Sequence, residues 1–170
     1  MYNKLFILTL CLFVYTETVD AQLSKPILKE ISKIQQTKKD ELGVGKRFAT
    51  TRKMLNESDS LFFINQKTDT VFLLEMYDME TGISYGCIWN KCKSQNYTYY
   101  HGGILEFKTD NLFTKYTRKL VSAWNINEIR KEEKNNPGFI SRKTICATRI
   151  IIGEKSKVDM ISFEEFFNFE

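Results

Sequence analysis

Short runs of β-branched and aromatic residues, separated by turn-forming residues, fill the middle of the chain between residues 61 and 107. The runs lie at 61–64, 70–77, 83–89, 97–101 and 104–107. β-Branched and aromatic residues are common in strands, whereas Asn, Asp and Gly favour the turns that join them. Residues 71–74 are apolar at every position, as expected of a central strand that is covered on both faces. The pattern predicts an antiparallel β-meander.

Two segments have the spacing of helices that pack on a sheet. Pro26 follows Ser24 in a helix-start signature, and apolar residues then recur every three or four positions, which predicts a short amphipathic helix over about residues 25–37. A second apolar stripe predicts one long helix over residues 112–134, with Asp110 as its N-cap. Each apolar stripe is expected to lie against the sheet.

The C-terminal part of the chain returns to strand-forming residues. The runs 144–152 and 157–163 flank a Gly-containing turn and predict a β-hairpin, and Ser162 with Glu165 has the spacing of a capping box for one terminal helical turn. The expected fold is one α+β domain over residues 22–170. It comprises an antiparallel sheet of about six or seven strands, an N-terminal helix and one long amphipathic helix packed on the sheet.

The first 21 residues have the pattern of a secretory signal peptide. An apolar run over residues 5–15 follows Lys4, and Ala21 precedes the expected cleavage point before Gln22. The run is too short to span a bilayer core, which takes about 20 apolar residues, and no later segment approaches that length. The Ala-Gln junction and the Lys-, Asn- and Ile-rich composition resemble those of exported bacterial proteins. We therefore expect a periplasmic or extracellular protein without a transmembrane segment in its mature chain.

Composition limits the classes of partner. The chain has 170 residues, of which 42% are hydrophobic, enough for a packed core. Removal of residues 1–21 leaves 24 basic and 19 acidic side chains, so the formal charge changes from +4 to +5. That mild excess lacks the dense Lys and Arg clusters of a nucleic-acid-binding protein. We therefore expect a glycan, peptide or protein ligand rather than a nucleic acid, and the oligomeric state stays open.

Three cysteines remain after the expected cleavage. Cys87 and Cys92 are the nearest disulfide candidates, pairing of Cys146 with either is the alternative, and the absence of any bridge is equally compatible with the spacing. A Cys-x4-Cys pair alone does not indicate a metal site, and the sequence holds no cofactor-binding motif. No metal or cofactor is therefore expected.

The single histidine, His101, is the candidate for catalytic chemistry. It is the last residue of the tyrosine-rich run 97–101 and precedes Gly102. A general base also needs a nucleophile or an acid within hydrogen-bonding distance, and none of the local signatures of a nucleophilic cysteine is present. A small secreted hydrolase centred on His101 is therefore the alternative hypothesis.

Aromatic and basic side chains provide the candidate binding surfaces. Five aromatic residues concentrate on two successive predicted strands and could stack on a ligand or pack beneath the long helix: Tyr85, Trp89, Tyr97, Tyr99 and Tyr100. A basic face of the long helix, formed by Lys115, Arg118 and Lys119, could contact an anionic surface. The sequence thus favours a non-catalytic binding or interaction module of the periplasm or cell surface.

Overall fold

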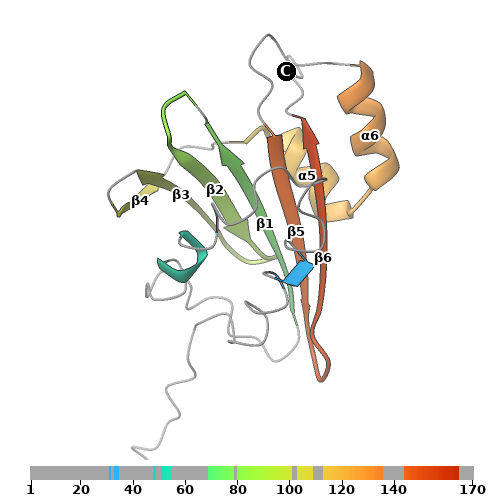
Figure 1. Cartoon of the computed structure of the whole chain (residues 1–170). Coiled ribbons are helices and arrows are strands. Elements are labelled where there is room, and N and C mark those ends of the chain that lie inside the picture. Colours follow the sequence, from blue (N-terminus) through green and yellow to red (C-terminus); the bar gives the residue numbers. More distant parts are fainter. Residues whose placement is uncertain are drawn as a thin grey trace, which may run out of the picture.

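A six-stranded antiparallel sheet and several helical segments form the part of the chain that the computed structural model describes (Figure 1). The described residues are 31, 33–34, 48, 51–54, 69–78, 80–100, 103–108, 113–135 and 144–164. The strands are β1 (Asp69–Tyr77), β2 (Ser84–Trp89), β3 (Ser94–Tyr100), β4 (Ile104–Lys108), β5 (Thr144–Ile152) and β6 (Lys157–Glu164). The helices that follow β4 are α5 (Lys115–Ala123) and α6 (Ile126–Asn135), and residues 31, 33–34, 48 and 51–54 are also helical. The predicted α+β class with an antiparallel sheet is confirmed.

Strand β1 lies inside the sheet, between β2 and β5, and both of these strands follow it in the sequence. The order is β4-β3-β2-β1-β5-β6, so the meander runs outward from β1 to β4. The chain then passes through α5 and α6, and the hairpin of β5 and β6 pairs on the other side of β1. Residues 71–76 are buried at every position. The predicted central strand is therefore confirmed.

The two faces of the sheet have separate hydrophobic cores because successive side chains of a strand point to opposite faces. Phe72 and Leu74 of β1 belong to the core that includes Leu120 of α5 and Ile129 of α6. Val71 and Leu73 belong to the core on the opposite face, together with Ile31, Phe48, Ile88 and Tyr97. Residues that precede the sheet in the sequence therefore cover one face, and α5 with α6 covers the other.

The prediction of one long helix over residues 112–134 is wrong, because the chain forms two shorter helices. Trp124 adopts a left-handed conformation with φ of 50°, and its backbone N–H donates to the carbonyl of Val121 at 2.9 Å, which ends α5. The Asn125 side chain then accepts a hydrogen bond from the backbone N–H of Glu128 at 3.2 Å and begins α6. Helical spacing continued through the break because both helices face the same core.

The start of α5 also differs from the start of the predicted long helix. The N-cap of α5 is Thr114, whose hydroxyl accepts a hydrogen bond from the backbone N–H of Thr117 at 3.1 Å. The predicted cap, Asp110, lies outside the described residues.

None of the helices in the described ranges has the length and the apolar content of a membrane-spanning segment.

The described residues cover the other predicted elements only in part. Of the N-terminal helix over 25–37, three described residues are helical, Ile31, Lys33 and Ile34, and the rest lies outside the described residues. The strand over 61–64 and the signal peptide over 1–21 also lie outside them. The terminal helical turn at Ser162 is wrong at its first residue, because β6 continues to Glu164 and pairs with β5 through Ser162 and Phe163.

Candidate binding surface

The candidate binding surface lies at the edge of the sheet that β4 forms. Gly103 precedes β4 with φ of 91°, and its N–H donates to the Tyr100 carbonyl at 3.3 Å, which reverses the chain after β3. Among the described strands, β4 pairs with β3 alone. Within the described strands, the other side of β4 has no hydrogen-bonded neighbour, and it is the side at which a further strand could pair.

Large apolar side chains are exposed on this edge. Ile104 is 57% exposed and Phe107 is 39% exposed, the highest values among the exposed large hydrophobic residues described. Neighbouring residues of β4 alternate between the faces, so Ile104 and Phe107 lie on opposite faces of the sheet. In the register with β3, Tyr100 is opposite Ile104 and Tyr99 is opposite Leu105. We name Tyr99, Tyr100, Ile104, Leu105 and Phe107 the β4 rim.

Two opposite charges flank Phe107 on the same strand. The Lys108 ammonium lies 2.5 Å from a carboxylate oxygen of Glu106, on the face of the sheet that carries α5 and α6. The hydrogen bond from Lys108 lowers the pKa of Glu106, with a smaller contribution from Tyr100, and Glu106 raises the pKa of Lys108. Both groups are therefore charged at neutral pH and exposed at the sheet edge.

The five candidate aromatic residues do not share one face. Tyr85, Trp89 and Tyr100 lie on the face that carries α5 and α6, whereas Tyr97 and Tyr99 lie on the other. Trp89 is buried, and its indole N–H donates to the Ser122 hydroxyl at 3.0 Å. Tyr97 is fully buried. The rings with accessible surface are thus Tyr85, Tyr99 and Tyr100, which are half-buried.

The candidate basic residues lie on α5, but one of them packs inward. Lys115 and Lys119 are exposed. The Arg118 guanidinium lies over the Trp89 ring, 5.2 Å from its centroid, in a cation–π contact. The structure therefore places two of these three charges on the open surface of the helix and the third against the sheet.

The three described cysteines, Cys87, Cys92 and Cys146, are free thiols in different surroundings. Cys87 is buried on the face that carries α5 and α6, Cys146 is buried on the opposite face, and Cys92 is exposed in the turn between β2 and β3. Burial raises the pKa of Cys87 to about 11 and that of Cys146 to about 12. A thiol with so high a pKa is a poor nucleophile at neutral pH.

Two further kinds of candidate chemistry are a catalytic histidine and a metal site. His101 lies outside the described residues, so the hydrolase hypothesis that depends on it stays a prediction. Among the residues that the structure describes, no group of three or more His, Cys, Asp or Glu is placed to hold a metal ion.

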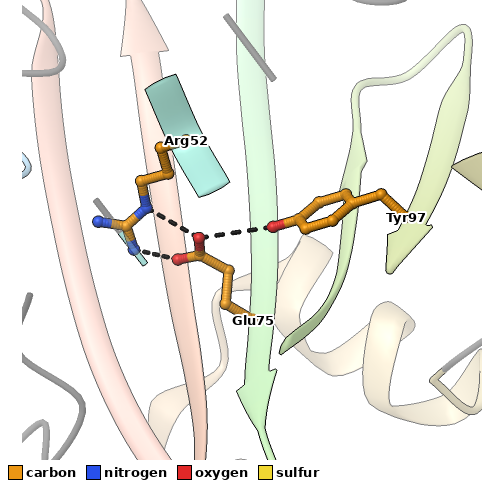
Figure 2. A network of polar contacts seen from close by, with 3 residues as sticks. All are labelled: Arg52, Glu75 and Tyr97. Carbon is orange, nitrogen blue, oxygen red and sulfur yellow. Dashed lines mark hydrogen bonds and ion pairs between the residues drawn. The ribbon is translucent and has the colours of Figure 1, made fainter. Parts of the chain in front are cut away.

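Sequence reasoning missed a buried polar network beside the rim, shown in Figure 2. The Arg52 guanidinium donates from Nε to Oε1 of Glu75 at 2.9 Å, and its Nη2 forms an ion pair with Oε2 of the same carboxylate. The Tyr97 hydroxyl donates to Oε1 of Glu75 at 3.4 Å. All three side chains are buried. The signal in the sequence was Glu75, an acidic residue between the apolar run 71–74 and Met76 in a predicted central strand.

Gly86 creates the space that this network needs. Glu75 on β1, Gly86 on β2 and Tyr97 on β3 are successive partners across the sheet. A Cβ atom on Gly86 would lie 2.0 Å from Cζ of Tyr97, so the tyrosine ring lies directly over the glycine. Without a side chain on β2, the Tyr97 hydroxyl reaches the Glu75 carboxylate two strands away.

The electrostatics of the network indicate a structural role. Burial raises the pKa of Glu75, and the adjacent Arg52 cation opposes that rise. Burial also raises the pKa of Tyr97 well above its usual value. The ion pair connects residues 51–54 to β1, and thereby fixes the segment that covers this face.

Comparisons with protein-family models, with curated proteins and with solved structures found no match to this chain.

Proposed function

We propose that this protein is an exported, non-catalytic interaction module that binds a protein or peptide ligand at the β4 rim. The observation that carries the proposal is the exposure of Ile104 and Phe107 on an edge strand. Exposed apolar side chains beside free backbone groups are the features by which a sheet edge accepts an added strand.

The arrangement of the rim favours an extended peptide over a glycan. Sugars stack on flat aromatic surfaces, but Tyr99 and Tyr100 are neighbours on one strand and therefore lie on opposite faces. An added strand would contact both faces at once, because its own side chains alternate in the same way. Ile104 on one face and Phe107 on the other would then each cover one side chain of the ligand.

Serine substitution on the rim is the test of the proposed surface. We expect I104S and F107S each to weaken binding of a peptide selected from a phage-displayed library by about 10- to 100-fold, because each removes about 1.5–3 kcal/mol of apolar burial. I126S is the matched control, since Ile126 is also exposed, at 36%, but lies at the start of α6. Isothermal titration calorimetry on the three variants measures the effect.

The variants distinguish binding at the β4 rim from binding on α6. Thermal unfolding of each variant checks that the fold is intact. Equal affinity of wild type, I104S and F107S, with all proteins folded, would contradict the proposed surface. A loss in I126S as large as the loss in F107S would place the ligand on α6 instead.

Export is the second part of the proposal, and the expected cleavage before Gln22 supports it. When the full chain is expressed in a Gram-negative bacterium, we expect the protein recovered from the periplasm or medium to have the intact mass of residues 22–170. Recovery of uncleaved protein from the cytoplasm alone would contradict the proposal. Mass spectrometry of the two fractions decides between these results.

A further inference from the structure

We propose that the strand that adds to the β4 rim is β4 of a second copy of this chain. The inference rests on the proposed function, because it names the partner of the same surface. What points to a second copy is the charge order of the strand, in which Glu106 and Lys108 flank Phe107. This order is complementary to itself when two strands run antiparallel.

Only one symmetric register matches the charges. In an antiparallel pair, directly opposite residues lie on the same face, and a two-fold axis places one residue opposite its own copy. With Phe107 at the axis, Glu106 of each copy lies opposite Lys108 of the other. With Glu106 at the axis, two carboxylates face each other. With Leu105 at the axis, Glu106 faces the apolar Ile104.

In the register with Phe107 at the axis, the two strands would make apolar contacts on one face of the sheet and charged contacts on the other. The two Phe107 rings, each 39% exposed in one copy, would pair on the face opposite to α5 and α6. The Glu106 and Lys108 side chains, which already form an ion pair within one copy, would form a network of four charges on the other face. The two sheets would join into one.

The size of the contact predicts weak association. In this register, residues 106–108 of each copy face one another within the bounds of β4. Three facing residues bury far less than the roughly 1,000 Å² that a stable interface requires, so the complex should exchange rapidly with free protein. Sedimentation velocity should therefore be measured at concentrations from about 10 µM to about 1 mM.

Charge reversal gives a test that a nonspecific contact would not pass. E106K and K108E should each weaken self-association by about tenfold or more, because like charges would then face each other twice. An equimolar mixture of E106K and K108E should associate as wild type does, because every facing pair is again opposite in charge. The double variant E106K/K108E should also self-associate as wild type does.

Two control variants make the same Glu-to-Lys and Lys-to-Glu changes outside β4. E154K, in the turn after β5, and K157E, on the other edge strand β6, alter net charge equally and should leave self-association unchanged. Wild-type protein that stays monomeric over the whole concentration range would overturn the inference. So would a mixture of E106K and K108E that remains as weak as either variant alone. If a selected peptide still bound the rim, the proposed function would stand and only the second copy as partner would be rejected.

Discussion

Replacement of Arg52 by methionine should lower the free energy of unfolding by about 3–5 kcal/mol near neutral pH, because it leaves the Glu75 carboxylate buried without its cation. Urea denaturation followed by circular dichroism measures the change. K53M is the matched control, since Lys53 is adjacent in the sequence but exposed. We expect K53M to change stability by less than about 0.5 kcal/mol.

The loss caused by R52M should depend on pH. Burial already raises the pKa of Glu75 from its ordinary value of 4.5, and removal of Arg52 should raise it further. A carboxyl whose folded pKa lies above its unfolded pKa destabilises the fold increasingly as pH rises from the unfolded value through the folded one. The loss should therefore be smallest below about pH 4.5 and largest at neutral pH. A loss that is equal at pH 4 and pH 7 would contradict this explanation.

Removal of both charges should restore much of the stability. R52M/E75L replaces the buried ion pair by apolar side chains of similar size, a change that is often neutral or stabilising. If the double variant were as unstable as R52M, packing of the arginine side chain rather than its charge would explain the single variant.

Gly86→Ala is the second substitution with a large expected effect. The added Cβ would lie 2.0 Å from Cζ of Tyr97, whose side chain is fully buried. Overpacking of this kind costs about 1–3 kcal/mol, and displacement of the ring also breaks its hydrogen bond to Glu75. Urea denaturation of G86A measures the loss.

Two further variants identify the cause of that loss. G153A is the matched control, because a Cβ on Gly153 meets no atom within 4 Å, and it should be neutral or slightly stabilising. Y97A removes the ring that G86A would strike, so G86A should cost much less in the Y97A background than in wild type. Equal costs in the two backgrounds would show that the tyrosine ring is not the obstacle.

Local patterns in the sequence predicted most of the sheet. Strands β1, β2, β5 and β6 were expected within a few residues of their observed bounds, because each is a continuous run of strand-forming residues between turns. The apolar residues 71–74 also identified the central strand correctly. These features depend on neighbouring residues, which a single sequence displays directly.

Features that depend on tertiary contacts were not predicted. A single left-handed residue, Trp124, divides the expected long helix, and tryptophan is not a residue that signals such a conformation. The network of Arg52, Glu75 and Tyr97 joins residues 45 positions apart at its extremes. The sheet register brings Glu75 and Tyr97 together, and the packing of residues 51–54 on the sheet adds Arg52. Tyr99 and Tyr100 lie on opposite faces because they are adjacent residues of β3, which strand alternation alone predicts. The faces of Tyr85 and Trp89 relative to them depend on the register of β2 with β3.

Amide hydrogen exchange along β4 tests the central claim, that the rim is where this protein binds its partner. Wild-type protein should be compared free and saturated with the peptide selected from the library, by mass spectrometry of proteolytic fragments. The account predicts additional protection in the fragment that contains residues 103–108 and unchanged exchange in the fragment that contains β6. Protection in β6 or α5, with unchanged exchange in β4, would contradict it.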